Sequence, residues 1–313
     1  MARAYGSNAA LIGAFESTYG ASPADGFTKL PFVSSTLGAE QPLVADDTLG
    51  NGRDPRAPSR DVVTVDGEIV IPLDVRNVGL WLKGAFGEPT TTGTGPYAHA
   101  FASGADGDDI PSLALEIGNP EVPSYRLAEG VRVNSITVPF ATSGTVSATV
   151  NVIAQGETPG GTTADIAPTE LAYSRFSAFQ GSVKFNGSAL GNVTGGELTY
   201  TNNLDPVRVI RDDGKIEGAD PTVAACTGSI TVRFADMALF NAATAGTPVA
   251  LEFAYTADTG RKLVFTVPEV YLPRPRIPIQ GPGGIEVTFN WQAAKPAAGN
   301  MLTAVLTNDV ASY

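Results

Sequence analysis

Two stretches of the chain alternate strictly between apolar and polar residues. Each begins two residues after a glycine, Gly144 or Gly283, so the two patterns run in the same phase. The apolar positions are Val146, Ala148, Val150 and Val152 in the first stretch and Ile285, Val287, Phe289 and Trp291 in the second. This alternation predicts strands with one buried and one polar face. A slip of one residue would exchange the faces, so the shared phase indicates two related strands.

Short motifs also recur in the same order in the two halves of the chain. Phe32, Ser35, Leu37 and Gly38 are matched, with identical spacing, by Phe185, Ser188, Leu190 and Gly191. Three further matches pair Gly52, Asp54 and Pro55 with Gly218, Asp220 and Pro221, Pro120-Glu121-Val122 with Pro268-Glu269-Val270, and Val138-Pro139-Phe140 with Ile277-Pro278-Ile279. Ordered matches indicate a duplicated module. Such a module lets one chain fill two equivalent places in a symmetric ring.

Turn and helix signals suggest how each module is built. Asp66-Gly67 lies between two β-branched runs, which predicts a hairpin, and Thr227-Gly228 takes this place in the second half. A helix is expected over residues 75–86, ending before a glycine, and another over residues 236–245 that also ends before a glycine. A helix after a hairpin in both halves strengthens the case for duplication.

Further elements are expected along the chain. Residues 131–140 and 145–153 predict a long pair of strands, and residues 301–306 alternate weakly, like an edge strand. Residues 271–278 are rich in proline, which suits strand ends or edges rather than a central strand. Residues 9–15 predict a short helix capped by the preceding asparagine.

These signals predict a mainly β fold built from two tandem β-sandwich or barrel modules, each with a short flanking helix and a long hairpin. The predicted parts are an N-terminal arm with a short helix (1–26), a first module (27–155), an extended linker (156–168), a second module (169–295) and a tail strand (296–313).

Composition narrows the possible functions. The chain has 313 residues, of which 43% are hydrophobic, so each module can bury a core. Glycine (35) and proline (23) are plentiful, as expected for short strands and tight turns. The net charge of −12 repels phosphate and argues against a specific grip on nucleic acid. A single cysteine excludes an internal disulfide, and no stretch reaches membrane-spanning length.

Catalytic signatures are missing from the sequence. His99 is the only histidine and Cys226 the only cysteine; they lie in different halves, so we expect packing roles rather than a catalytic triad. Zinc would lack nitrogen and sulfur ligands, and no Gly-rich phosphate loop with Lys and Ser or Thr occurs. We therefore expect no enzyme activity, no cofactor and no metal.

Acidic and basic clusters have alternative interpretations. Residues 106–109 contain three aspartates without the spacing of a calcium loop, so we expect a solvated turn. Asp46-Asp47 and Asp212-Asp213 fall at comparable points of the two halves. Spacing alone leaves a glycosidase pair open, but aromatic residues are only 8%, and solvated surface is favoured. The basic pair Arg274 and Arg276 is expected to meet an acidic neighbouring subunit rather than DNA.

An ordered set of segments resembles tail tube proteins of long-tailed bacteriophages and prophages. The segments are residues 4–16, 29–35, 37–43, 52–55, 65–67, 113–118, 120–123 and 306–313. The resemblance covers most of the chain. It implies rings whose inner strands join into one closed barrel, and stacked rings that form a tube for DNA passage into the host. Because single-module relatives form hexameric rings, a two-module chain implies a trimer with pseudo-sixfold symmetry.

The resemblance also implies partners and a location. The partners are further copies of the chain and the tape measure, tail terminator and distal tail proteins. The subunit would be made in the bacterial cytoplasm and reside in the virion tail, without membrane contact. Genomic DNA would pass without specific binding.

The sequence also offers candidate residues for the lumen of the tube and for contacts between subunits. Duplex DNA carries about one charge per 1.7 Å of axis, so a basic wall would hold it and we expect an acidic lumen. Candidate lumen residues are Asp46, Asp47, Asp212 and Asp213, and candidate subunit contacts are Tyr5, Phe15, Arg274 and Arg276. The N-terminal arm and residues 88–96 are candidate contacts between rings. Two alternatives stay open: a carbohydrate-binding or adhesive pair of β-sandwiches, and a β-rich hydrolase that uses carboxylates.

Overall fold

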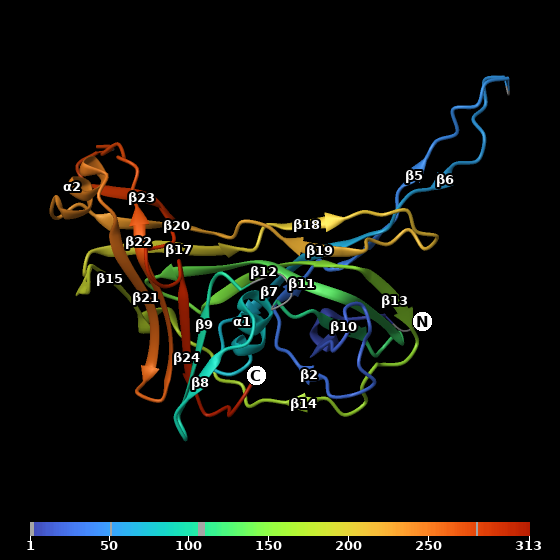
Figure 1. Cartoon of the computed structure of the whole chain (residues 1–313), viewed down its shortest axis with the longest axis horizontal. Coiled ribbons are helices and arrows are strands. Elements are labelled where there is room, and N and C mark those ends of the chain that lie inside the picture. The colour runs from blue at the N-terminus through green and yellow to red at the C-terminus, as the bar shows by residue number, and fades with distance from the viewer. Residues whose placement is uncertain (1–2, 51, 106–109, 280) are drawn as a thin grey trace.

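A computed structural model describes residues 3–50, 52–105, 110–279 and 281–313 (Figure 1). In the first half the strands are β1 (Ala10–Phe15), β2 (Thr28–Lys29), β3 (Ser34–Ser35), β4 (Gly38–Glu40), β5 (Leu43–Val44), β6 (Ser59–Arg60), β7 (Thr64–Pro72), β8 (Thr90–Thr92), β9 (Tyr97–Ala102), β10 (Leu113–Asn119), β11 (Ser124–Ala141) and β12 (Ser147–Ala154). In the second half they are β13 (Gly156–Gly160), β14 (Thr169–Glu170), β15 (Gly181–Phe185), β16 (Ser188–Ala189), β17 (Val193–Thr201), β18 (Leu204–Val207), β19 (Gly218–Pro221), β20 (Ala225–Arg233), β21 (Val249–Asp258), β22 (Arg261–Tyr271), β23 (Glu286–Ala293) and β24 (Thr303–Asn308). The helices are α1 (Val78–Phe86) and α2 (Ala238–Ala245), with 3-10 turns at Gly6–Asn8 and Ala178–Gln180.

Six strands of each half follow the same order, and every pairing within these two series is antiparallel. The first series is β1, β10, β11, β12, β7 and β4, and the second is β15, β21, β22, β23, β20 and β17. The mainly β fold with a repeated module is therefore confirmed. In the described residues of one chain the sheet stays open and forms no closed barrel.

The pairing register is repeated as well. Gly67 of β7 lies opposite Val152 of β12, and Gly228 of β20 lies opposite Trp291 of β23. Val152 and Trp291 are the equivalent positions of the two alternating stretches. The phase seen in the sequence is therefore the phase of the folded sheet, with the alternate residues of β23 buried.

The predicted hairpin at Asp66-Gly67 is wrong, because β7 runs straight through it. Glycine is needed here for close approach of the next strand rather than for a turn. A Cβ atom at Gly67, whose φ is +156°, would lie 2.5 Å from the backbone of Leu37. At Gly228 it would lie 2.0 Å from the carbonyl oxygen of Glu197.

Other predictions about the arm, linker and tail also need correction. The predicted helix at the N-terminus is strand β1, buried in the middle of the sheet, because a short apolar run suits a buried strand equally well. Part of the predicted linker, β13, pairs with β11. The predicted edge strand in the tail is β24, which lies between β9 and β22 and so joins the two halves.

Three of the four motif matches do not join equivalent places. Ser35 pairs with β7, whereas Ser188 closes a tight hairpin with β15. The Gly52 motif lies between β5 and β6 and the Gly218 motif in β19, while the Pro120 motif is a turn and the Pro268 motif lies within β22. Only the match of Val138 with Ile277 agrees with the repeated register.

The two helices are equivalent in order but differ in burial. Both follow their predicted places and end at a glycine, as expected. Nearly all of α1 is buried, whereas only Leu239 and Ala243 of α2 are. A single large core runs through both modules, and its largest fully buried side chains include Trp81, Phe101 and Phe265. Among the described residues no helix is both long and apolar enough to span a membrane.

Candidate assembly interface

The two modules of the chain meet through a β-ladder between β11 and β17. Ser135 to Ala141 lie opposite Thr201 to Gly195 in seven consecutive antiparallel pairs. Because β11 also pairs with β12 and β17 also pairs with β20, this ladder fuses both modules into one continuous sheet. Figure 1 shows β11, β17 and β20 running alongside one another. A module–module contact is thus made by edge-to-edge strand pairing.

Aromatic side chains seal this junction on the buried side of the sheet. The ring of Phe140, from the first module, lies 4.9 Å from that of Phe253 and stacks 5.0 Å from that of Tyr255, both in the second. The Tyr255 hydroxyl donates a hydrogen bond to the carbonyl oxygen of Pro139 at 2.7 Å. Burial raises the pKa of Tyr255, so the phenol remains a donor. Phe140 therefore anchors one module in the core of the other.

An amide side chain closes the end of the same junction. The buried Nδ2 group of Asn202 donates to the carbonyl oxygens of Ala85, at the end of α1, and of Val133 in β11. Nearby, Phe86 stacks on Tyr200 with ring centroids 4.3 Å apart. Helix α1 is therefore held against a strand of the second module, which accounts for part of its burial.

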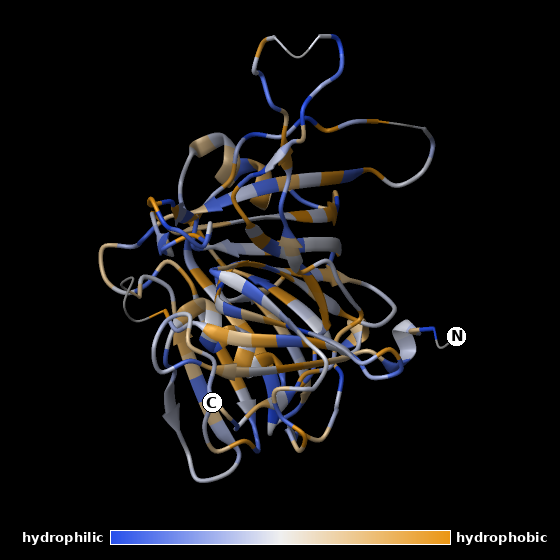
Figure 2. Ribbon diagram, turned by 90° about the vertical axis from the view of Figure 1, so that its right-hand side faces the viewer, coloured by the Kyte–Doolittle hydropathy of each residue, from blue (hydrophilic) through white to orange (hydrophobic). Residues whose placement is uncertain are grey.

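The opposite face of the shared sheet, here called the polar face, is lined by hydroxyl and amide groups. Paired residues share a face, and one row crosses both modules: Val70, Thr149, Thr137, Thr199, Thr227 and Gln292. The hydroxyls of Thr137 and Thr199 bond across the junction at 2.9 Å, and Thr231 and Thr288 repeat this contact. Figure 2 shows the alternation as blue and orange bands along the strands.

Acidic side chains outnumber basic ones on the polar face. By the pairing register, its described charged residues are Glu40, Asp66, Glu68, Glu197 and Glu286 against Arg132 and Arg233. None of these acids was among the predicted lumen residues. The signal was present in the sequence, since each of them belongs to the polar set of an alternating strand.

The row of strands from β7 to β23 ends in two edges that carry no partner strand among the described residues. One is the outer edge of β3 and β4, which pair only with β7. The other is residues 272–279, here called the Pro-rich segment, which follows β22 and adopts no strand. Both expose apolar side chains: Val33 is 58% exposed and Ile279 is 76% exposed. Open edges of this kind invite pairing with another chain.

Two long projections leave the sheet at equivalent points. The first is the arm with β5 and β6, between β4 and β7; the second is the β18–β19 hairpin, between β17 and β20. Figure 1 shows both extending toward the same end of the molecule. Each tip exposes an apolar side chain, since Leu49 is 92% exposed and Ile210 is fully exposed.

A comparison with known protein families identifies the family of the chain. The phage tail tube protein family matches residues 6–293, which is nearly the whole chain. The chain belongs to this family. A search of curated proteins finds no match. The tail tube protein is therefore a structural component of the virion tail, and the resemblance noted in the sequence is confirmed.

The candidate lumen acids of the tail tube protein lie on the projections rather than on the polar face. Asp46 and Asp47 are in the arm, and Asp212 and Asp213 are in the β18–β19 hairpin. A hydrogen bond from Arg211 lowers the pKa of Asp213 to about 2, so this carboxylate braces the hairpin. Hydrogen bonds from Thr48 lower the pKa of Asp46. The structure does not bring the two pairs together into one site.

The four candidate contact residues occupy three different surroundings. Tyr5 is 60% exposed, and its backbone N–H donates to Glu121. Phe15 ends β1, under the ammonium group of Lys83 at 4.6 Å. Arg274 lies over the ring of Phe240 in α2 at 5.3 Å, and Arg276 is exposed in the Pro-rich segment. Their role in subunit contacts stays a prediction.

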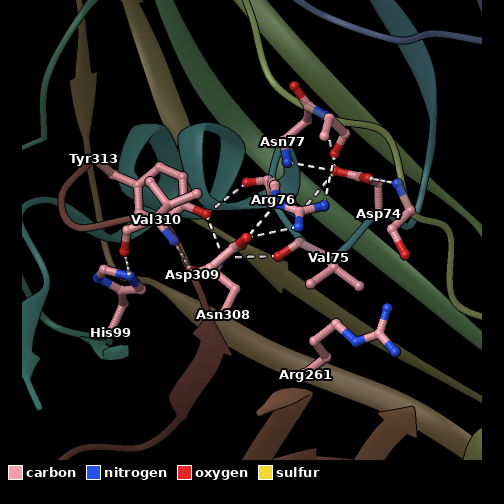
Figure 3. Close-up of polar contacts among 12 residues, drawn as sticks. Asp74, Val75, Arg76, Asn77, His99, Arg261, Asn308, Asp309, Val310 and Tyr313 are labelled. Carbon is pink, nitrogen blue, oxygen red and sulfur yellow. Dashed lines mark hydrogen bonds and ion pairs between the residues drawn. The ribbon is translucent and has the colours of Figure 1, made fainter. Parts of the chain in front are cut away.

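A buried polar cluster holds α1 and the tail of the chain together (Figure 3). The buried Asp74 carboxylate accepts hydrogen bonds from the backbone N–H groups of Arg76, Asn77 and Ser174. Arg76 forms a two-pronged ion pair with Asp309 at 2.7 Å. The cluster therefore fixes the beginning of α1 against residues that follow β24.

The ring of Tyr313 completes the cluster. Its hydroxyl donates to the carbonyl oxygen of Arg76 at 2.6 Å, and its ring meets His99 edge-on at 4.8 Å. A Cβ atom at Gly79 would lie 2.1 Å from this ring, so the helix can pack here only with glycine. The modules are thus joined by the β11–β17 ladder and by β24, besides the short parallel pairing of β2 with β14.

The remaining chemical candidates are structural. The ring nitrogens of buried His99 contact the Thr91 hydroxyl and the carbonyl oxygen of Val310, both at 2.9 Å. Cys226 is buried, which raises the pKa of its thiol to about 12. No cluster of three or more potential metal ligands occurs in the described parts of the chain. Residues 106–109, considered above as a calcium loop, lie outside the described residues.

Proposed function

We propose that three copies of the tail tube protein close into a ring and that stacked rings form the conduit for DNA. The observation that carries this proposal is the β11–β17 ladder, in which one module already joins the next by strand pairing. Each chain also has two open edges: the outer side of β3 and β4 in the first module and the Pro-rich segment in the second. Repeating the same join between chains would build a ring of equivalent modules. The number three comes from the hexameric rings that the family resemblance implies.

Closure would turn the polar face into the wall of a wide barrel. Counting the Pro-rich segment, three chains would supply roughly 24 strands, and barrels of 16–18 strands already leave an aqueous channel. Acidic residues outnumber basic ones on this face, and hydroxyls fill the rows between them. Such a wall repels phosphate on balance, because its acidic residues outnumber Arg132 and Arg233. This charge balance supports passage of DNA without specific binding.

The two projections suit contacts between stacked rings. They extend toward the same end of the subunit, and their tips expose Leu49 and Ile210. Contacts between the two unlike ends of a ring do not close on themselves, so they give an open tube. At the ends of that tube the subunit would meet the tape measure, tail terminator and distal tail proteins.

Electron microscopy of the purified protein tests the ring. We expect rings or tubes of uniform diameter with threefold symmetry, and about six similar lobes around each ring. Mass measurement of single rings should give three chains. A monodisperse monomer at high protein concentration, or a ring of two, four or six chains, would contradict the proposal. A strongly basic bore in a ring reconstruction would overturn the proposed passage without binding.

A further inference from the structure

The Pro-rich segment occupies the same place in the second module that the end of β11 occupies in the first. Arg132 pairs with Ile153 where β11 meets β12, and Tyr271 pairs with Gln292 where β22 meets β23. Ile153 and Gln292 are equivalent in the repeated alternation, so Tyr271 is equivalent to Arg132. Counting onward residue by residue, residues 274–279 correspond to residues 135–140.

Side-chain alternation supports this equivalence. In β11, Ile136, Val138 and Phe140 point into the core. Their counterparts are Pro275, Ile277 and Ile279, of which Ile277 packs against the core already. Pro139 even falls in step with Pro278. The segment therefore carries the pattern of a strand, but in the single chain it has no partner.

The edge formed by β3 and β4 occupies the place of β17. Ser35 lies opposite Ile69 of β7, as Gly196 lies opposite Ile230 of β20. Leu37 and Leu198 are then equivalent, and both are buried beside a glycine of the neighbouring strand. The outer side of β17 carries β11, whereas the outer side of β3 and β4 is open.

We propose that residues 274–279 of one subunit pair antiparallel with β3 and β4 of a second copy, in the register of the β11–β17 ladder. Arg274 then lies opposite Glu40, Arg276 opposite Gly38 and Ile279 opposite Ser35. The inference rests on the proposed ring and adds the two edges that meet and their register. The occupant is a second copy, because β7, β12, β11, β17, β20 and β23 separate the two edges within one chain.

Charge and exposed surface agree with this register. It places the guanidinium of Arg274 beside the carboxylate of Glu40, both exposed in the single chain. It also brings Ile279 close to Val33, the two exposed apolar side chains of the open edges. Their counterparts at the internal junction are Phe140, which is buried, and Thr194.

The free subunit holds the Pro-rich segment away from this position. A groove lies between the segment and the polar face, lined by Arg274, Arg276, Thr231, Thr288 and Asn290. Pro275 lacks the backbone N–H that its counterpart Ile136 has. The segment must therefore swing outward and become extended when a second copy binds, and its prolines keep it from pairing indiscriminately beforehand.

Engineered cysteines can test the register directly. Arg276→Cys with Gly38→Cys should give covalent multimers after mild oxidation of assembled rings, because these positions lie directly opposite each other. A Cβ atom at Gly38 would meet the flexible ends of two side chains, Arg126 at 3.3 Å and Glu157 at 3.9 Å. Arg274→Cys with Glu40→Cys provides a second pair on exposed sites. Non-reducing gel electrophoresis should show dimers and a closed trimer for both.

Two controls accompany the cross-linking. Thr137→Cys with Thr199→Cys marks the equivalent internal pair, and should form a disulfide within one chain whether or not rings form. Arg276→Cys with Ser34→Cys is displaced by four residues and should cross-link at least tenfold less. Wild-type protein, with buried Cys226, reports the background.

The outcomes separate the register from the ring itself. Rings that form while the displaced pair cross-links as well as the matched pairs, or while no pair does, overturn the register and leave the proposed function standing. Protein that stays monomeric by mass measurement overturns both. As a second measurement, Arg274→Glu should reduce ring formation at least tenfold, and adding Glu40→Arg should restore it. Failure of the double variant to recover, with folding intact, also counts against the register.

Discussion

The end of β11 and the Pro-rich segment are the same element in two situations. In the first module this element is a strand between β12 and β17, with Phe140 only 6% exposed. In the second it follows the same alternation, yet it is unpaired and Ile279 is 76% exposed. The difference is the neighbour. The end of β11 pairs with β17 of the second module, whereas no described strand pairs with the Pro-rich segment.

The helices teach the same lesson about neighbours. Helix α1 is buried because Asn202, Tyr200 and the residues after β24 cover it from the second module and the tail. Helix α2 ends at a similar glycine and has a similar length, but only two of its residues are buried. A module of this fold therefore becomes fully packed only when another module lies on its open side.

The largest expected effect is at the internal junction. Phe140→Ala should lower the free energy of unfolding by about 3–5 kcal/mol, because it empties the contact with Phe253 and Tyr255. Chemical denaturation of the unassembled protein measures this change. Ile279→Ala is the matched control, and in the free subunit it should change stability by less than about 0.5 kcal/mol. Equal losses at both sites would contradict the comparison.

The cap of α1 should come next. Asp74→Ala leaves three backbone N–H groups without their buried acceptor, so we expect a loss of about 2–3 kcal/mol. Asp236 accepts a hydrogen bond from Ala238 at exposed α2, and Asp236→Ala should cost about 0.5–1 kcal/mol. Thermal unfolding of the two variants compares them. A larger loss of stability in Asp236→Ala than in Asp74→Ala would contradict the prediction.

A smaller loss is expected where the tail packs on α1. Gly79→Ala places a methyl group against the ring of Tyr313 and should cost about 1–3 kcal/mol. Near-ultraviolet circular dichroism should report the displaced tyrosine ring. Gly84→Ala is a useful reference, since its added Cβ atom would meet side-chain methyl groups at 3.0 and 3.2 Å rather than overlap a ring. An unchanged tyrosine signal in Gly79→Ala would argue against this packing.

The smallest effect on the single subunit should come from Pro275→Ile. The change should alter its stability by less than about 0.5 kcal/mol, because the residue lies in the unpaired segment. It restores the side chain found at the equivalent position of β11 and the missing N–H group, so assembly should become several-fold faster. Light scattering after dilution follows assembly. Slower assembly would show that the proline favours, rather than restrains, the paired state.

The sequence predicted the repeat largely through one signal. The shared phase of the stretches after Gly144 and Gly283 is a property of buried and exposed faces, and it carried over into the folded register. The glycine-terminated helices were also predicted correctly. By contrast, the motifs around Phe32 and Phe185 have the same residues but lie in strands that are not equivalent. A short motif does not indicate which face of a sheet its residues occupy or which strand they pair with.

The rest depended on long-range pairing that local patterns do not contain. The apolar run of β1 gave no sign that it pairs with β10, far along the chain, and it was predicted as a helix. Asp66-Gly67 has the composition of a turn, yet the glycine serves the close approach of Leu37. The polar face could have been listed from the alternation, but its extension across both modules required the β11–β17 ladder.

The placement of β24 has a consequence for how fast the subunit can fold. Its residues pair with β9, where Thr303 lies opposite Ala102. This ladder can therefore form only after most of the chain has been synthesised and folded. Ladders between such distant partners carry a large loop-closure cost and typically form slowly, on the order of milliseconds to seconds. Until β24 is paired, the apolar residues of β9 and β22 stay exposed to solvent. Folding of the single chain would then limit the rate at which assembly-ready subunits appear, and self-association would follow quickly.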